Sequence, residues 1–221
     1  MTGPGQPGGR RRYHHGDLRE ALIETTIELL GERDIQAFSM AEASRRLGVA
    51  VAAPYRHFAG REDLLAAVAV RAAGLLGQRL GREAATGDPA ERLAAAARAY
   101  VRFAWAQRPL FQALAGSGLD KRRHPEIGQA AQSLGQVFLA PARALAGGDE
   151  AATARLSSAV VATAHGHAAL LLDGTFGPGP AAAEAVAGQA AAAARALIDG
   201  RAWLTGPQHG DLPPDSPVPT S

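Results

Sequence analysis

Two pairs of histidines are the side chains in this sequence that could bind a metal ion or transfer protons. His165 and His167 are separated by one glycine, and His14 and His15 are adjacent. On a helix, residues i and i+2 lie about 200° apart around the axis, whereas helical zinc pairs use positions i and i+4. Neither pair can therefore hold one metal ion from a single helix face. The chain also lacks cysteine, so we predict no metal site and no disulfide.

The other chemical motifs argue against an enzyme. The sequence shows no Ser/His/Asp set, no paired carboxylates and no glycine loop of the phosphate-binding type. We therefore predict neither catalysis nor a cofactor. His165 keeps two interpretations: a hydrogen-bonded core histidine, or a polar contact in a ligand pocket, because such pockets are mostly apolar with a few placed polar groups.

The stretch VAVAAPYRHF (residues 49–58) suggests a different chemistry, contact with DNA. A short predicted helix, Ser39–Leu47, and a turn at Gly48 come directly before it. Two short helices joined by such a turn are typical of a helix-turn-helix. The second helix of that motif enters the major groove with its N-terminal residues near the bases. The sequence therefore predicts a DNA-binding helix after Gly48.

The leading half of this stretch is apolar. It carries none of the Arg, Lys, Asn or Gln side chains that hydrogen-bond a base edge in two places. Its alanine and valine methyl groups can instead pack on the methyl group of thymine. Pro54 disfavours helical geometry in the residue before it, so we expect the regular helix to begin near Ala52 or Ala53. We expect the segment to position the protein on DNA more than it specifies a sequence.

Side chains in and around the stretch supply the predicted contacts. The predicted DNA-contacting residues are Ser39, Arg45, Arg46, Ala50, Val51, Ala52, Ala53, Pro54, Tyr55, Arg56, His57 and Arg61. Of these, Tyr55, His57 and Arg61 have polar ends that could reach phosphates, and the other arginines are candidates for bases or further phosphates. Two alternatives stay open. Tyr55 and Phe58 could instead pack in the core of the small domain, and Arg10–Arg12 could enter a minor groove or only aid solubility.

The elements that must position these residues are helical throughout. Hydrophobic residues make up 47% of the 221 residues but aromatic residues only 5%, because alanine, a strong helix former, dominates. Apolar spacing and breaks predict an all-α chain of about nine helices, at 17–30, 39–47, 52–58, 61–86, 90–116 (divided at Pro109), 126–146, 150–173 and 180–203. No apolar run approaches the roughly 20 residues of a membrane span, and the net charge is only +2. We expect a soluble, cytoplasmic protein.

Up to residue 68 the sequence resembles the TetR family of bacterial one-component regulators. PYRHFAGREDLL (Pro54–Leu65) is close to the family's Tyr-x-His-Phe-x-x-Lys-Glu-x-Leu signature, and YHHGDLR (Tyr13–Arg19) is typical of one branch. AHGHAALLLDG (Ala164–Gly174) is similar to a His-Gly motif in that branch's C-terminal domain. The chain departs from the pattern at three positions, with Ala50 in place of Ser or Thr, Arg61 in place of Lys and Val161 in place of Trp.

The resemblance implies a homodimeric transcriptional repressor that a small-molecule effector releases from palindromic double-stranded DNA. The domains would be a disordered basic arm (1–12), a helix-turn-helix domain (13–68), an effector-binding and dimerisation domain (69–205) and a disordered proline-rich tail (206–221). Candidate effector-binding residues are Tyr100, Phe103, Trp105, Phe111, Phe138 and His165. The alternative is that these residues are plain core.

Helices 150–173 and 180–203 have apolar faces wider than the core of one chain easily covers, which predicts that they form the dimer interface. The small residues assigned to these faces are Ala159, Val160, Ala162, Thr163, Ala169 and Leu170, and Ala183, Val186, Ala190, Ala194 and Leu197. Burial of both helices within one chain is the alternative. Ala50, which lacks the hydroxyl of a usual N-cap, motivates a second function: a dimeric small-molecule-binding protein whose DNA-binding head is weakened.

Overall fold

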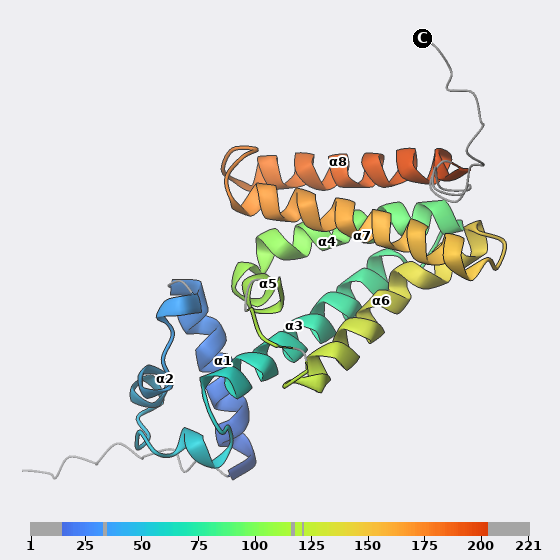
Figure 1. Ribbon diagram of the computed structural model, residues 1–221. Helices are drawn as coiled ribbons and strands as arrows, with labels where there is room; N and C mark the ends of the chain where they lie inside the picture. The colour runs from blue at the N-terminus through green and yellow to red at the C-terminus, as the bar shows by residue number, and fades with distance from the viewer. Residues whose placement is uncertain (1–14, 33–34, 116–117, 121, 203–221) are drawn as a thin grey trace, which may run out of the picture.

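The chain is all-α in the computed structural model, which describes residues 15–32, 35–115, 118–120 and 122–202. Over these residues it has eight α-helices and two 3₁₀ turns: α1 (His15–Glu32), η1 (Ile35–Ala37), α2 (Met40–Leu47), η2 (Pro54–Arg56), α3 (Arg61–Glu83), α4 (Pro89–Ala106), α5 (Arg108–Ala115), α6 (Pro125–Leu145), α7 (Glu150–Leu172) and α8 (Pro180–Asp199) (Figure 1). The all-α prediction is confirmed. The predicted disordered arm and tail lie outside the described residues.

The head, residues 15–60, forms one end of the molecule (Figure 1). Ser39 begins α2 as predicted, because its Oγ accepts a hydrogen bond from the Glu42 N–H at 3.4 Å. Gly48 ends α2 with a φ of 67°, a left-handed conformation that glycine adopts without strain. Phe58 is 4% exposed and belongs to the hydrophobic core. The core interpretation of Phe58 is therefore correct.

The expected third helix is only one turn of 3₁₀ helix. Its predicted start is right, since Ala53 occupies the N-cap position and Pro54 is the first residue of the turn. The prediction of a regular α-helix here is wrong. Pro54 has no N–H to donate, the His57 N–H bonds back to the Pro54 carbonyl at 2.9 Å, and Gly60 is already extended before α3. Too few residues remain between the proline and α3 for an α-helix to propagate.

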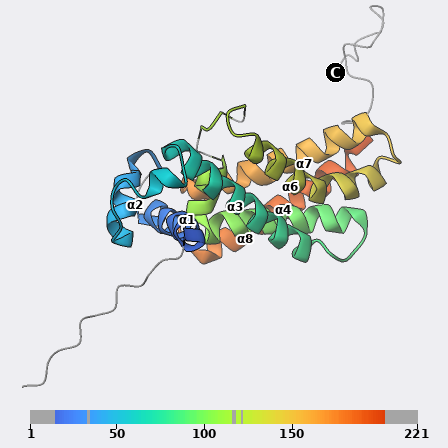
Figure 2. The same cartoon turned by 90° about the horizontal axis from the view of Figure 1, so that it is seen from below.

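α3 connects the head to the rest of the molecule and runs beside α6 in both views (Figures 1 and 2). Glu62 and Asp63 lie in its first turn, where carboxylates favour the helix dipole. Leu64, Val68 and Leu76 are fully buried along one side. Among the described helices, α3 alone is long and apolar enough to cross a membrane, and half of its most apolar stretch is buried inside the fold. That burial is what a core helix needs.

α4 is the centre of the core domain and packs against α8, α7, α6 and α3. A complete capping box begins it: Asp88 Oδ1 accepts from the Glu91 N–H at 2.8 Å, and Glu91 Oε2 accepts from the Asp88 N–H at 3.1 Å. The predicted division near Pro109 is confirmed, because α4 ends at Ala106 and α5 begins at Arg108. The chain turns there without breaking the core.

Other helix ends match the predictions less evenly. Gly147 and Gly148, with φ of 62° and 88°, separate α6 from α7 as predicted. The start of α1 was predicted two residues late, since the helix begins at His15 and Asp17 lies inside it. Asp149 begins α7 by accepting a hydrogen bond from the Ala152 N–H at 2.9 Å.

Candidate DNA-binding surface and effector site

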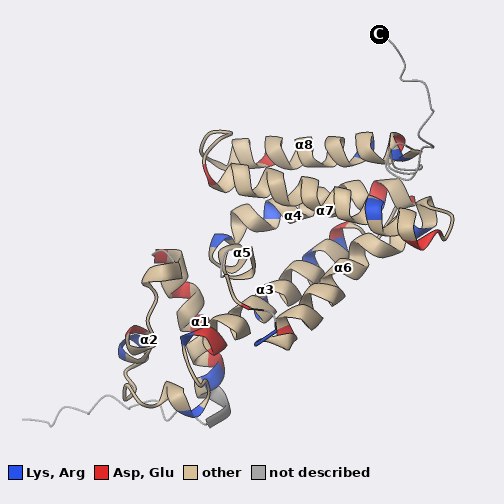
Figure 3. Cartoon of the chain, viewed as in Figure 1, with Lys and Arg blue, Asp and Glu red and all other residues tan. Residues whose placement is uncertain are grey.

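Exposed side chains of α2 and of the segment around η2 form the surface predicted to contact DNA. Val51 and Tyr55 are 55% and 57% exposed, although both are large hydrophobic residues. Arg45 and Arg56 are also exposed, and Figure 3 shows arginines on α2 and near η2 at the outer side of the head. These groups take little part in the core and can meet a partner.

The other predicted residues of the η2 segment divide by burial. Ala50 and Ala52 are exposed, whereas Ala53 is half-buried and Pro54 is buried. The Ala50 carbonyl accepts a hydrogen bond from the Ala53 N–H at 2.8 Å. Ala50 therefore starts a turn and does not cap a helix. Pro54 packs inside the head, so we leave it out of the surface.

Arg46 is held by an acidic side chain of α1. Its Nη1 and Nη2 donate to the two carboxylate oxygens of Glu32 at 2.6 and 2.8 Å, a bidentate pair. The hydrogen bond to Glu32 is the largest cause that raises the pKa of Arg46. Arg46 thus links α2 to the end of α1 within the head.

Arg61 is held by two backbone carbonyls of the head. Its Nε donates to the Phe38 oxygen at 3.0 Å and its Nη2 to the Ile35 oxygen at 2.5 Å. A guanidinium presents several donors in a fixed fork, whereas a lysine ammonium is a single point. This geometry accounts for arginine at a position where the TetR pattern has lysine. Arg61 therefore stabilises the fold of the head, and its predicted phosphate contact stays a prediction.

His57 also turns inward. Its Nε2 atom is buried, with no hydrogen-bond partner among the described residues. The side chain lines a cavity of about 470 Å³ between the head and the core, together with Asp63, Arg71 and Glu126. His57 is thus half-buried with its Nε2 atom inside the fold, and the phosphate contact predicted for it stays a prediction.

Three of the six candidate effector residues lie together. The Tyr100 hydroxyl is 3.1 Å from Nδ1 of His165, and the Phe111 ring stands edge-on to the Tyr100 ring at 5.8 Å between centroids. The Phe111 and His165 rings are 5.6 Å apart. Burial raises the pKa of Tyr100 from 10.0 to about 12, so its hydroxyl keeps its proton to a higher pH than an exposed tyrosine would. Helices α4, α5 and α7 thus bring one hydroxyl and one imidazole together beside an aromatic ring.

The remaining candidates are spread through the core. Phe103 and Phe138 are 3% and 1% exposed, and Trp105 packs on the core while half-buried. All three belong to or pack against the same hydrophobic core as Tyr100 and Phe111. His167 lies apart as well: its Nδ1 is 2.8 Å from the Thr163 carbonyl. Over the described residues, no group of three or more histidines and carboxylates is arranged to hold a metal ion.

The outer faces of α7 and α8 differ from the prediction. Val160, Ala183, Val186, Ala190 and Ala194 are buried within the chain, because α8 packs its small residues on α4 and α7. These five therefore cannot face a second copy.

The other six residues predicted for these faces are at least partly exposed, and Leu170 is one of them. On α7, Leu170 is 45% exposed. Phe176, in the loop after it, is 37% exposed and stacks on His167 with 6.4 Å between ring centroids. No periodic pattern pointed to Phe176, since it lies outside a helix. Figure 3 shows few charged residues along most of α7 and α8.

Comparison with known families decides the class of protein. Residues 22–68 match the model of the tetR family of bacterial regulatory proteins, and residues 93–203 match the Tetracyclin repressor-like C-terminal domain. The chain belongs to the TetR family. The first match spans most of the head, and the second covers α4 to α8 apart from the first residues of α4. A search of curated protein sequences gave no match.

Solved structures share the fold. A protein of unknown function from Rhodococcus sp. RHA1 is 28% identical, with a TM-score of 0.69 over 85% of this chain and 98% of its own. The TetR family regulator PfmR from Thermus thermophilus is 22% identical, with a TM-score of 0.60 over 80% and 96%. FadR from Bacillus subtilis, solved in complex with stearoyl-CoA, is 13% identical, with a TM-score of 0.62 over 86% and 99%. Because the chain matches both family models, this TetR family member is a DNA-binding transcriptional regulator.

Proposed function

We propose that the protein is a homodimeric, cytoplasmic repressor that binds a near-palindromic operator and is released by a small-molecule effector. The observation that carries this proposal is the uncovered surface on the head of a TetR family chain, where Val51 and Tyr55 are more than half exposed. A head that served only as packing would bury these two side chains. We assign no catalytic role.

Different residues of the proposed DNA surface make different kinds of contact. Tyr55 and the exposed arginines, Arg45 and Arg56, contact phosphates or bases, and Val51 packs on a thymine methyl group. Ser39, at the N-terminus of α2, adds a hydroxyl while it caps the helix. In a dimer, two such surfaces would meet half-sites about one helical turn (~34–36 Å) apart.

The proposed dimer uses the outer faces of α7 and α8. Leu170 and Phe176 give this side of the chain two exposed large hydrophobic residues. A second copy related by a two-fold axis would cover the same patch on both chains. The proposal keeps the predicted four-helix interface, with Leu170 from the predicted face and with Phe176 added, and it leaves out the five buried residues.

The proposed effector contacts are Tyr100, Phe111 and His165. A neutral hydroxyl and an imidazole beside an aromatic ring can orient a polar group of an otherwise apolar ligand. FadR, which shares the fold, binds stearoyl-CoA, whose long acyl chain is apolar. An effector that binds the core domain more tightly in one orientation of α3 than in another would favour that orientation. It would thereby change the separation of the two heads.

One observation favours a second function. The single 3₁₀ turn of η2 gives the head less regular structure than a recognition helix would. The alternative is a dimeric small-molecule-binding protein with a weakened DNA-binding head.

Retention of sheared genomic DNA on the purified protein at near-physiological salt, followed by sequencing, tests the proposal. We expect a few enriched fragments that share a near-palindrome, and their loss with Tyr55→Ala. Uniform, salt-sensitive retention or no retention would contradict the repressor and favour the second function, because non-specific binding depends on phosphates alone.

A further inference from the structure

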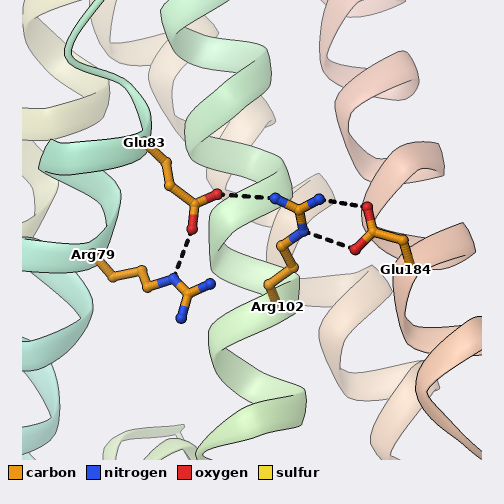
Figure 4. Close-up of polar contacts among 4 residues, drawn as sticks. All are labelled: Arg79, Glu83, Arg102 and Glu184. Atoms are coloured by element: carbon orange, nitrogen blue, oxygen red, sulfur yellow. Dashed lines mark hydrogen bonds and ion pairs between the residues drawn. The ribbon is translucent and has the colours of Figure 1, made fainter.

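Four charged side chains from three helices form a continuous chain of contacts across the core domain (Figure 4). On α3, Arg79 Nε donates to Glu83 Oε1 at 2.6 Å. The other carboxylate oxygen of Glu83 accepts from Arg102 Nη1 on α4 at 3.2 Å. Arg102 Nε and Nη2 in turn donate to the two oxygens of Glu184 on α8 at 2.9 and 2.5 Å. Arg102 thus contacts both neighbouring helices at once.

Geometry separates this network from an ordinary surface ion pair. Isolated exposed pairs contribute little, because solvent screens them and two flexible side chains must be ordered. Here the guanidinium of Arg102 is bidentate to Glu184 and still reaches Glu83. The side chains of Arg102 and Glu83 are 35% and 27% exposed, whereas Glu184 is 59% exposed, so the two-oxygen geometry and the shared guanidinium carry the distinction. The hydrogen bond from Arg102 is also the largest cause that lowers the pKa of Glu184. A bidentate arginine fixes orientation as well as distance.

The network occupies a special place in the architecture. Glu83 is the last residue of α3, the helix whose first residue directly follows the head. Glu184 lies near the start of α8, one of the two helices of the proposed dimer interface. α3 packs on α6, α5, α4 and α1, while α8 packs on α4 and α7. Arg102, on the helix between them, therefore joins the core end of the connecting helix to the dimer helix.

We propose that Arg102 is a positioning residue that clamps the core end of α3 to α8 and so fixes the separation of the two DNA-binding heads. This inference rests on the proposed dimeric function. Without the clamp, the end of α3 loses its link to α8 and keeps only its packing and the hydrogen bond from Arg92 Nε on α4 to the Ala84 carbonyl at 3.1 Å. Its angle relative to α8 can then vary more, and a small change there is carried along 23 helical residues to the head. Fewer molecules then hold the head separation that an operator requires, and the apparent affinity falls by that fraction.

A distance measurement between head and core tests the clamp without DNA. The chain has no cysteine, so spin labels can be placed on Glu28→Cys in α1 and Asp199→Cys at the end of α8, both exposed positions. Labelled chains are diluted with unlabelled ones, so that distances within one chain dominate. We expect a narrow distance distribution for the parent protein and a broader one for Arg102→Gln.

Two further variants make the result specific. Glu184→Gln removes the carboxylate on α8 at a side chain that is 59% exposed, so the fold should persist and the distribution should again broaden. Arg143→Gln is the matched control, because it loses the same charge and breaks a pair with Glu150 at 2.9 Å between α6 and α7. It should leave the distribution narrow. Equal widths for Arg102→Gln and Arg143→Gln would overturn the clamp.

Operator spacing gives a readout that a purely structural role would not move. Inserting one base pair between half-sites rotates one of them by about 35° relative to the other. We expect the parent protein to discriminate strongly against the longer operator, and Arg102→Gln to lose about tenfold of that discrimination, with unchanged binding to a single half-site. Unaltered discrimination would contradict the clamp. If the parent protein binds no operator, the proposed function fails, and the distance measurement still decides the clamp.

Discussion

Pro109 on α5 lies so close to Gly31 on α1 that a β-carbon added at position 31 would stand 3.4 Å from Pro109 Cγ. This contact is one of the points where the core domain touches the head, because α5 packs on both α1 and α3. Phe111, two residues further along α5, contacts Tyr100 and His165. The short helix α5 therefore has the proposed effector site on one side and the head on the other.

Substitutions at Gly31 measure how tightly α5 and α1 fit. Gly31→Ala adds only a β-carbon at ordinary contact distance and improves helix propensity, so the free energy of unfolding should stay equal or rise by up to about 1 kcal/mol. Gly31→Val adds two more carbons towards Pro109 and should lower it by about 1–3 kcal/mol. Urea unfolding followed by circular dichroism measures both values.

Gly74 is the matched control for this pair. It lies in α3, and a β-carbon there meets nothing within 4 Å. Gly74→Val should therefore lower the free energy of unfolding by less than Gly31→Val does. Equal losses at both positions would show that helix propensity dominates and that the α5–α1 contact is loose.

The buried hydroxyl of Tyr100 should make stability depend on pH in the alkaline range. The folded protein holds this proton more tightly than the unfolded chain, because burial raises the pKa from 10.0 to about 12. The stabilisation is therefore complete below the unfolded pKa and is lost as the pH rises from about 10 through 12.

Tyr100→Phe isolates this effect. At neutral pH it should lower the free energy of unfolding by about 0.5–1.5 kcal/mol, because Nδ1 of His165 loses its partner. Between pH 8 and pH 11 the variant should lose less stability than the parent protein. Tyr55→Phe, at an exposed hydroxyl, is the control for removing a phenol. Parallel pH profiles for Tyr100→Phe and the parent protein would contradict the burial argument.

The sequence predicted a feature correctly when the residues that determine it lie close together in the chain. Ser39, Gly48 and Pro109 act on their own backbone, so the helix boundaries that they set were predicted correctly. The length of η2 was not, because propensity says little about how many residues a turn leaves before the next helix. Whether Val160 faced its own chain or a second copy depended on how α8 packs, which small apolar residues on both faces of a helix do not reveal.

The same reasoning separates the site residues. Tyr100 and His165 were both candidates, but their contact joins residues 65 positions apart, and no local pattern encodes it. The network of Arg79, Glu83, Arg102 and Glu184 was missed for this reason. Single arginines and glutamates on helices usually face solvent, and only the packing of α3, α4 and α8 brings these four together.

Arg61 gives a prediction that distinguishes a structural role from a DNA contact. Arg61→Gln should lower the free energy of unfolding by about 1.5–3 kcal/mol, because two hydrogen bonds from a charged donor to the Ile35 and Phe38 carbonyls are lost. The free energy of unfolding of Arg61→Lys should lie between those of the parent protein and Arg61→Gln, since an ammonium cannot reproduce the fork of donors. Arg45→Gln, an exposed residue on α2 with the same change of charge, should leave stability nearly unchanged. If Arg61→Gln instead weakens DNA binding and its salt dependence while stability holds, the phosphate contact predicted from sequence is correct.

Leu170 tests the proposed dimer interface. A glutamate on this uncovered face of α7 would put two like charges into a symmetric contact without water to solvate them, so Leu170→Glu should shift the protein from two chains to one. Light scattering during gel filtration measures the molar mass directly. Leu75→Glu is the matched control, because Leu75 is 38% exposed on α3, outside the proposed interface. Dimers that persist in Leu170→Glu, or that dissociate equally in both variants, would place the interface elsewhere.

Because two heads on one dimer bind a palindrome far more tightly than one head binds a half-site, the monomeric variant should also lose the operator while it still binds its effector.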